Sequence, residues 1–489
     1  MPSIVQAFGF FHWIGISHYL NLLLLGLLVR SGLEILSAHP KLYWRDDCRP
    51  GGEWLRFSRK ELPTDRLWTS TDEETSFSSV IALPGRRNLG MGRHWHFFCA
   101  IFWLLNGLLY VGLLFGTGEW RRLVPTSWGV FPAAARDVWT YAHLQAPPPG
   151  DPYNAIQQLT YAGVVFVLAP ILVLTGAAMS PAIAARHPWY LRLFGGRQPA
   201  RSIHFLAMVA MVGFTVVHTL LVVVEDFPRN MAWIIHGRHS SERVAVWIGL
   251  GGLVVVLAVH VWATLVSLSR RRAVQRWLGW VIAPVRRALF HPIISRQRYT
   301  SADVSPFFRV NGYPPTSLEY QRLAERGFVD WRLSVGGLVE APLELSLTDL
   351  RAMPRRTQIT KHNCIQGWSA VGEWTGVAVA DVLDRCRPLA NARYLVLRGF
   401  DEHEGRVYYE TIALELARCP QTILAYEMAG APLSVPHGAP CRLRVETQLG
   451  FKMVKYLRSL ELVADYRHLG DGQGGFREDT QFYGPEAGI

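Results

Sequence analysis

Cysteine is scarce in this chain, and the few cysteines present form no metal-binding or disulfide pattern. The 489 residues include 6 cysteines, and no two of them stand in a Cys-x-x-Cys pair or at regular spacing. Structural zinc sites and disulfide frameworks need such spacing, so the sequence argues against both. The N-terminus also lacks the basic stretch and the small-residue cleavage site of a signal peptide, so its first apolar run is expected to be retained.

Charged residues are also few, and they are unevenly distributed. Only 18% of the residues are charged, while half are apolar. Arginines flank the apolar runs and contribute to the net charge of +12, a pattern typical of membrane topology rather than of nucleic-acid binding. Five runs reach the roughly 20 residues that a membrane span needs. We therefore predict an all-α bundle over 1–268, with spans near 9–30, 94–115, 155–179, 202–224 and 244–268.

Histidines inside these spans are the chemically informative residues, because an ionisable group in hydrocarbon normally has a partner or a function. The stretch RSIHFLAMVAMVGFTVVHTL holds His204 and His218 on one helix face, about 21 Å apart along the axis. That spacing fits two metal sites stacked across a membrane. The alternative is a pair of histidines that are hydrogen-bonded to neighbouring helices.

A b-type haem needs a second imidazole from a facing helix. Spans two and four run in the same direction, so the early histidines of span two lie level with His204. Span one runs the opposite way, so its early histidines lie level with His218. The predicted haem ligands are His96 (or His94) with His204, and His18 (or His12) with His218.

The membrane half resembles the bacterial cytochrome b561 superfamily over about 8–268. The stretch HYLNLLLLGLLVRSG resembles that family's first ligand motif, and RHWH and RSIH resemble its R-x-x-H signature, which favours His18, His96 and His204. The family comprises di-haem, quinone-reactive subunits, so the resemblance implies two b haems and a quinone or quinol partner in the lipid bilayer. For His260 the sequence leaves both a quinone site and simple packing open.

The pattern changes after the last span. An arginine-rich segment, 269–300, reads as an amphipathic linker at the membrane surface. From about residue 301 onward, short β-branched strands such as WRLSVGGLV and ARYLVLRGF alternate with glycine and proline. We predict an α+β domain over 301–489.

This second half resembles the sulfite oxidase superfamily, the molybdopterin-binding oxidoreductases. The segment KHNCIQGWSAVGEWTGV matches the family's cysteine segment, in which the thiolate of Cys364 would ligate molybdenum. FFRVNGYPP and VPHGAPCRLRVETQLGFKMVKYLRSLEL match two further blocks, and GQGGFREDTQFYG matches the end of many members. The resemblance implies an α+β molybdopterin fold and these cofactor-binding residues: Asn311, His362, His437, Arg442 and Lys455.

The side chains near Cys364 in the sequence can each be interpreted in two ways, as functional or as structural. Lys361 and His362 are suited to lowering the pKa of the Cys364 thiol, and a structural use is the alternative. Trp368 and Trp374 are suited either to walling the metal pocket or to filling the core.

The absence of a cytochrome b5 domain before this half, and of an immunoglobulin-like domain after it, brings it closer to methionine sulfoxide reductase catalytic subunits. We expect electrons to pass from quinone through the His18/His218 haem and the His96/His204 haem to molybdenum at Cys364, for reduction of an S- or N-oxide. Alternatives are a sulfite dehydrogenase that feeds quinone and a non-catalytic redox-sensing membrane module. The arginine-rich loops favour a cytoplasmic catalytic domain in the bacterial inner membrane, whereas family analogy favours the periplasm.

Overall fold

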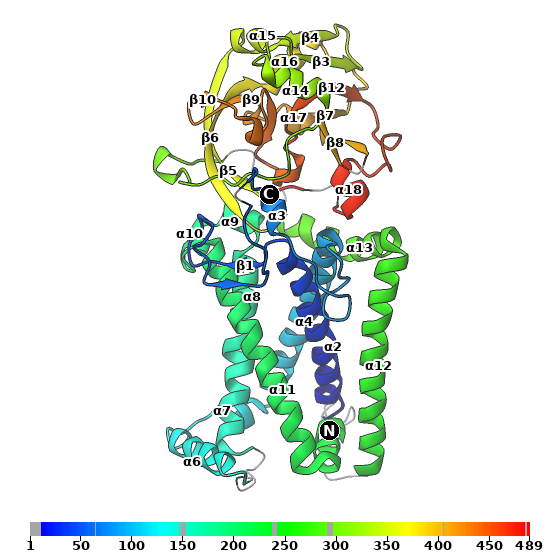
Figure 1. The fold of residues 1–489 in the computed structure, drawn as a ribbon. Helices are drawn as coiled ribbons and strands as arrows, with labels where there is room; N and C mark the ends of the chain where they lie inside the picture. The colour runs from blue at the N-terminus through cyan, green and yellow to red at the C-terminus, as the bar shows by residue number, and fades with distance from the viewer. Residues whose placement is uncertain are drawn as a thin grey trace.

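The computed structural model describes residues 11–63, 65–145, 147, 153–236, 242–290, 297–403, 405–484 and 487–489, without the side chains of Phe11 and His12. Five helices among these residues are long and apolar enough to cross a membrane, which confirms the predicted bundle (Figure 1). They are α2 (Phe11–Ser37), α4 (Leu89–Gly116), the continuous run α7 (Ala155–Gly163), η1 (Val164–Leu168) and α8 (Ala169–Ala178), then α11 (Arg197–His236) and α12 (Glu242–Ser269).

Proline accounts for two irregularities in these helices. The π-helical turn η1 ends just before Pro170, which cannot donate the backbone hydrogen bond that a regular α-helix requires. Helix α11 runs beyond the predicted 202–224, and it is bent at Asp226 (φ −165°, ψ 85°), two residues before Pro228. The apolar part of α11 therefore ends at the bend.

Short elements join the spans and cover their ends. Helix α13 (Arg271–Phe290) follows the last span and crosses the end of the bundle beneath the strand-rich half (Figure 1). The connections contain β1 (Lys41–Leu42), β2 (Leu55–Arg56), α3 (Ser70–Glu73), α5 (Trp120–Leu123), α6 (Val130–Ala142), α9 (Pro181–Arg186) and α10 (Pro188–Arg192).

The C-terminal half is an α+β structure, as predicted, built around two sheets. The first has the order β4-β3-β12-β7-β8, in which β3 and β12 are parallel and the other neighbours antiparallel. Its strands are β3 (Arg332–Gly337), β4 (Leu343–Ser346), β7 (Tyr394–His403), β8 (Arg406–Ala413) and β12 (Leu457–Val463). A large apolar core that includes Trp331, Leu397 and Leu460 lies against this sheet.

The second sheet has the order β10-β9-β6-β5, with β11 also paired to β9. Its strands are β5 (Arg355–Asn363), β6 (Ser369–Ala378), β9 (Thr422–Met428), β10 (Ala431–Pro432) and β11 (Arg442–Val445). Short helical elements complete this half: η2 (Ser301–Asp303), α14 (Leu318–Glu325), α15 (Leu347–Ala352), α16 (Val379–Cys386), α17 (Leu414–Ala417), η3 (Val435–His437), η4 (Gly450–Lys452) and α18 (Phe476–Gln481). The turn between β5 and β6 contains Cys364 and points toward the membrane bundle (Figure 1).

The strand-rich half sits on the end of the bundle where α2 ends and α4 and α11 begin (Figure 1). A shared apolar cluster joins the two halves there: Ala38, Tyr43 and Leu89 pack with Cys364 and Trp368. The Cys364 turn is therefore part of the contact between the two halves.

Candidate functional site

His96 of α4 and His204 of α11 face each other within the bundle. Their ring centroids are 6.5 Å apart and their planes are inclined by 64°. A metal held between two imidazoles needs nitrogen–metal distances of about 2 Å on each side, as in other histidine sites. The spacing of these rings is compatible with that requirement, so the residues fit a haem iron with two axial histidines.

Two hydroxyls fix the tautomers of these rings. The Ser31 hydroxyl donates to the Leu27 carbonyl (2.7 Å), so its oxygen accepts from Nδ1–H of His96 (3.2 Å). The Thr175 hydroxyl likewise donates to the carbonyl four residues earlier (2.6 Å) and accepts from Nδ1–H of His204 (3.0 Å). Each ring thus keeps its Nε2 lone pair for a metal, which is how outer residues usually orient ligating histidines. Sequence reasoning missed both hydroxyl residues, because neither belongs to the histidine motifs.

His18 of α2 and His218 of α11 are the second pair of histidines that the sequence predicts as haem ligands. They are close enough to affect each other electrostatically. His18 Nδ1 lies 3.0 Å from the Ile14 carbonyl, while the His218 ring is stacked on Phe214 and packs edge-on against Tyr161. The neighbours of these two rings are a backbone carbonyl, Phe214 and Tyr161, whose hydroxyl lies 3.5 Å from His218 Nδ1.

The alternative ligands are placed differently. His94 Nδ1 is 2.8 Å from the carbonyl of Gly90 on its own helix, whereas His96 is the residue that faces His204. The geometry therefore favours His96, and the side chain of His12 lies outside the described residues.

His260 does have a partner. Its Nδ1 lies 3.2 Å from the guanidinium of Arg30, which also donates to Thr264 and to the Ser79 carbonyl at 2.7 Å each. A Cβ on Gly26 would lie 2.8 Å from the His260 ring, so the glycine permits this close approach. These contacts favour the packing interpretation of His260.

Cys364 is 1% exposed and lies among amide side chains. Its sulfur is 3.7 Å from Asn311 Nδ2 and 3.5 Å from Gln366 Oε1. Burial raises the pKa of the thiol to about 12, although a backbone hydrogen bond at Gln366 and the charges of Arg477 and Arg197 act in the opposite direction. A buried thiol of this kind becomes a thiolate when it binds a soft metal ion.

Cations from distant parts of the chain act on this thiol. The sequence had left Lys361 and His362, which are close to Cys364 in the chain, open between this role and a structural one. In the structure, the cationic groups whose charge acts on the sulfur are Arg477 of α18 and Arg197 of α11. His362 instead packs against Trp368 and Phe308, and burial together with Arg444, Arg442 and Lys455 lowers its pKa well below the usual value.

A buried cationic cluster lies beside the Cys364 turn. The Lys455 ammonium donates to the carbonyls of Asn311 (2.6 Å) and Pro436 (3.1 Å), and Arg442 donates to the carbonyl of His437 (2.8 Å). Burial and the charge of Arg442 lower the pKa of Lys455 to about 7 and that of His437 to about 4. Burial and Arg444 lower the pKa of Arg442 to about 9.

This cluster fits an anionic cofactor. Among the described residues, the buried Arg442 Nε has no hydrogen-bond partner, whereas buried polar groups normally have one. A phosphate would supply an acceptor and relieve the repulsion among the cations. The structure thus brings Asn311, His437, Arg442 and Lys455 together, with His362 packed behind them. The Trp374 ring packs against this cluster, with the guanidinium groups of Arg442 and Arg444 5.0 and 4.3 Å from its centroid.

The Cys364 turn is attached directly to the helix that carries His204. Gln198 donates to the Gly367 carbonyl (2.9 Å), and Arg197 donates to the Trp368 carbonyl (3.5 Å). Six residues separate Gln198 from His204, which on a helix is about 9 Å along the axis.

A buried ion pair also joins the strand-rich half to the membrane half. Arg309 of the strand-rich half pairs with Glu73 of the loop between the first two spans at 2.6 Å, both 1% exposed. Burial would raise the pKa of Glu73, but the hydrogen bond from His39 and the charge of Arg309 outweigh it and hold the pKa at about 2.

Comparison with known proteins gives two family matches. Residues 10–237 match the model "Prokaryotic cytochrome b561", and residues 321–468 match "Oxidoreductase molybdopterin binding domain".

Among curated relatives, a "Putative protein-methionine-sulfoxide reductase subunit YedZ1" of Azospira oryzae is 30% identical over 204 residues, which cover 42% of this chain and 69% of the relative. A "Protein-methionine-sulfoxide reductase catalytic subunit MsrP" of Xanthomonas axonopodis pv. citri is 33% identical over 144 residues. That match covers 27% of this chain and 45% of the relative, so the chain spans under half of the catalytic subunit.

Two further matches are more remote. A "Nitrate reductase [NADPH]" of Fusarium oxysporum is 27% identical over 181 residues, 32% of this chain and 19% of the relative. The solved sulfane dehydrogenase SoxCD of Paracoccus pantotrophus is 25% identical and covers 31% of this chain and 41% of the solved one, with a TM-score of 0.27, too low to bear on the argument.

Proposed function

Because this chain belongs to the prokaryotic cytochrome b561 family in its membrane half and to the molybdopterin-binding oxidoreductases in its C-terminal half, we propose that it reduces an S-oxide with electrons from membrane quinol. In the overall reaction, quinol loses two electrons and two protons, the sulfur–oxygen bond breaks, and the oxygen leaves as water. The names of the methionine-sulfoxide reductase relatives support an S-oxide as the acceptor.

The residues divide this work between two regions, 1–268 and 301–489, joined by 269–300. When bound, the b haems would supply one-electron transfer, and the molybdopterin centre, reduced in two one-electron steps, would supply two-electron oxygen-atom chemistry. His96 and His204 would hold one haem and His18 and His218 a second. Cys364 would ligate molybdenum, with Asn311, His437, Arg442 and Lys455 around the pterin and its phosphate.

One observation carries this proposal: the Cys364 turn rests on the N-terminus of the helix that contains both His204 and His218. The hydrogen bonds from Arg197 and Gln198 hold that turn about 9 Å along the helix from His204. A reductase needs its metal sites held at fixed, short separations, and a rigid helix supplies that spacing. The distal site near His218 is left for the quinol.

The side of the membrane is a separate question. The loops at the catalytic end carry many arginines, which supports a cytoplasmic catalytic domain by the positive-inside rule. Protease digestion of sealed vesicles of known orientation tests this. The C-terminal half should be cut only when the cytoplasmic face is exposed.

The reaction is tested on the detergent-purified full chain with its cofactors. The haems are reduced with a stoichiometric quinol, and methionine sulfoxide is then added while their absorbance is followed. Rapid reoxidation that is abolished by Cys364→Ser, with unchanged haem spectra, is the expected result. Reoxidation by nitrate alone, or reduction of oxidised haems by sulfite, would contradict the proposal. Haem and molybdenum analysis should give two haems and one molybdenum per chain.

A further inference from the structure

Helix α13 begins where the last span ends, so it starts at the level of the membrane surface. A single residue, Arg270, separates the end of α12 from Arg271, the first residue of α13. The helix then runs across the end of the bundle and not along it (Figure 1). Its Trp277 ring lies 5.0 Å from that of Phe98 and 6.3 Å from that of Trp95, both near the start of α4. Aromatic rings gathered in this way are typical of a membrane–water interface, so α13 lies level with the lipid headgroups.

One face of α13 holds the C-terminal segment of the catalytic half, which includes α18. Three side chains of this face donate hydrogen bonds of 2.7–2.9 Å to backbone carbonyls of that segment. Donors lie on both sides of Pro284, so the helix keeps the same face toward this segment along its length. The donors and their acceptors are Arg272 with Glu478 and Asp479, Gln275 with Tyr483, and Arg286 with Gly488.

A second face of α13 packs on the bundle. Val274 and Leu278 are buried in a cluster with Leu27 and Met91 of the spans. Because successive helix residues are rotated by about 100°, this face lies roughly a quarter turn from the face that holds the C-terminal segment. The side of α13 opposite that segment therefore points toward the membrane. It presents only apolar residues: Ala273, Trp277, Val281, Pro284, Val285 and Ala288.

The remaining, outer face of α13 carries arginine and tryptophan side by side. Arg276, Trp280 and Arg287 are separated by four and seven residues, so they lie in one stripe along the helix. Trp280 is 77% exposed, and both arginines are exposed as well. The helix contains no acidic residue that would balance their charge. This stripe is therefore basic and borders the apolar, membrane-facing side.

We propose that α13 binds anionic phospholipids, with its apolar side among the acyl chains and Arg276 and Arg287 on the headgroup phosphates. Helices that lie in a membrane surface combine an apolar face with basic side chains in this way, and the basic residues add attraction toward anionic lipid. The two arginines are eleven residues apart, about 16 Å along the axis, so each binds a separate headgroup. The apolar side beside them favours a lipid over a soluble phosphate.

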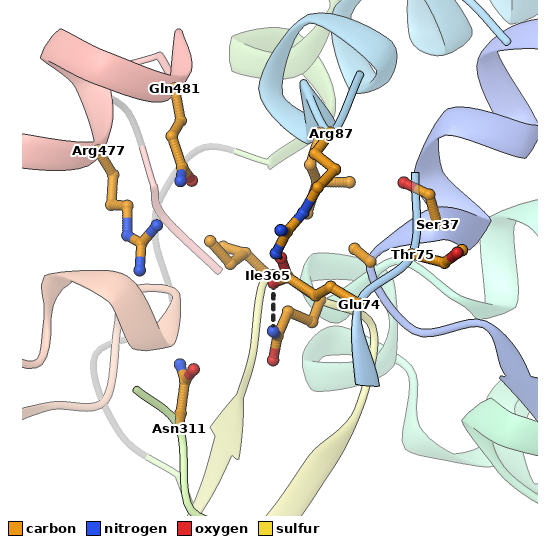
Figure 2. Close-up of a pocket in the computed structure, with 11 residues that line it drawn as sticks. Ser37, Glu74, Thr75, Arg87, Asn311, Ile365, Arg477 and Gln481 are labelled. Carbon is orange, nitrogen blue, oxygen red and sulfur yellow. Dashed lines mark hydrogen bonds and ion pairs between the residues drawn. The ribbon is translucent and has the colours of Figure 1, made fainter. Parts of the chain in front are cut away.

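Lipid binding at α13 has a consequence for the catalytic half, because the same helix holds α18. Arg477 and Gln481 of α18 form one wall of a small cavity between the two halves, and Glu74 and Arg87 lie on the opposite wall (Figure 2). The charge of Arg477 also acts on the Cys364 thiol. Anchoring of α13 to lipid thus fixes the position of a cation that acts on the predicted metal ligand.

The test measures lipid binding to the detergent-purified full chain with its cofactors. Native mass spectrometry follows the bound lipids while phosphatidylglycerol, which is anionic, or phosphatidylcholine, which has no net charge, is added. We expect two phosphatidylglycerol molecules to bind about 5-fold more tightly than phosphatidylcholine, since each arginine at a membrane surface favours anionic lipid by about that factor.

Variants locate the two lipids. Arg276→Gln and Arg287→Gln should each remove one preferentially bound phosphatidylglycerol, and the double variant should remove both. The control, Arg322→Gln with Arg385→Gln, changes two exposed arginines of α14 and α16, far from the bundle, and should remove neither (Figure 1). Trp280→Ala should weaken both lipids alike, because it removes apolar area and no charge. Unchanged haem spectra show that each variant is folded.

Three results would overturn the lipid site. They are equal binding of the two lipids to the wild-type protein, full retention of the preference in the double variant, and displacement of phosphatidylglycerol by glycerol 3-phosphate at similar concentration. The last result would identify soluble phosphate as the occupant. Because lipid binding is measured without turnover, these results would leave the proposed reductase function intact.

The link from α13 to α18 is tested in nanodiscs. Tryptic cleavage after Arg477 should be slower in nanodiscs that contain phosphatidylglycerol than in nanodiscs of phosphatidylcholine alone. In the Arg276→Gln/Arg287→Gln variant the two rates should be equal. Equal rates in the wild-type protein would contradict the anchoring of α18 through α13.

Discussion

Each of the two histidine pairs of the bundle has one member on α11, yet the surroundings of the two pairs differ. At the end near the catalytic half, Ser31 and Thr175 fix the Nδ1 atoms of both rings. At the opposite end, His218 has Phe214 stacked on it and the Tyr161 hydroxyl at 3.5 Å, the limit of a hydrogen bond. The contrast teaches that the pair beside the catalytic half is rigidly pre-oriented, while the distal pair has more freedom.

Removal of one histidine from each pair should have the largest effect. His204→Ala should lose the haem beside the catalytic half, which we call the proximal haem; the haem predicted at His218 is the distal one. Because the electron path to the catalytic half is then broken, S-oxide turnover should fall by more than about 100-fold with any electron donor. His218→Ala should lose the distal haem and quinol-driven turnover, but keep turnover driven by a small artificial donor. Haem content and turnover with both donors check this. If both variants lost the same turnover with both donors, the two haem sites would not have the separate roles proposed for them.

Weakening the contact between the two halves should have the second-largest effect. Arg309→Met removes one of the two buried cations that pair with Glu73 and leaves Lys41, so the cost should be below the about 3–5 kcal/mol of a buried charge left without any partner. We expect earlier thermal release of the catalytic half and slower reoxidation of the proximal haem, with the distal site unaffected. Arg66→Met removes a half-exposed pair with Asp72 and should cost at most about 1 kcal/mol. Equal effects of the two variants would contradict a special role for the Arg309–Glu73 contact.

The same contact predicts a dependence on pH. Because the pKa of Glu73 is held at about 2 in the folded protein, below its usual value of 4.5, its contribution is present above about pH 4.5 and is lost as the pH falls toward 2. Attachment of the catalytic half should weaken in that window. Limited proteolysis across the pH series measures it. The Glu73→Gln variant should be less well attached at neutral pH and should show a flatter pH profile.

The hydroxyls beside the proximal pair should give the smallest effect. Ser31→Ala and Thr175→Val remove the acceptors that orient His96 and His204, and such outer contacts are typically worth about 10–100-fold in metal affinity. We expect weaker proximal haem retention and a shifted proximal potential. Thr215→Val is the control, since the Thr215 hydroxyl also donates to the carbonyl four residues back, at 2.8 Å. A shift of the distal potential instead would contradict the assignment.

Most of the fold was predictable from the sequence, and only part of the site was. Apolar run length alone predicted the five spans, and the change to β-branched strands predicted the α+β half. Periodicity left His94 and His96 as alternatives, the R-x-x-H resemblance favoured His96, and the contact of His96 with His204 agrees with that choice. Glu74 was missed because it is almost 300 residues from Gln366 in the chain and accepts its hydrogen bond (2.6 Å) only when the two halves pack. Adjacency in the chain pointed to Lys361 and His362 as cations near the thiol, whereas Arg477 and Arg197, whose charges act on it, come from distant segments.

The burial of Cys364 has a consequence for how the protein matures. The thiol is 1% exposed and lies in a cluster shared with the membrane half. Because the Cys364 turn rests on α11, we expect the pterin cofactor to be loaded before the two halves close. A chain that closes without the cofactor should then stay inactive with its membrane part complete.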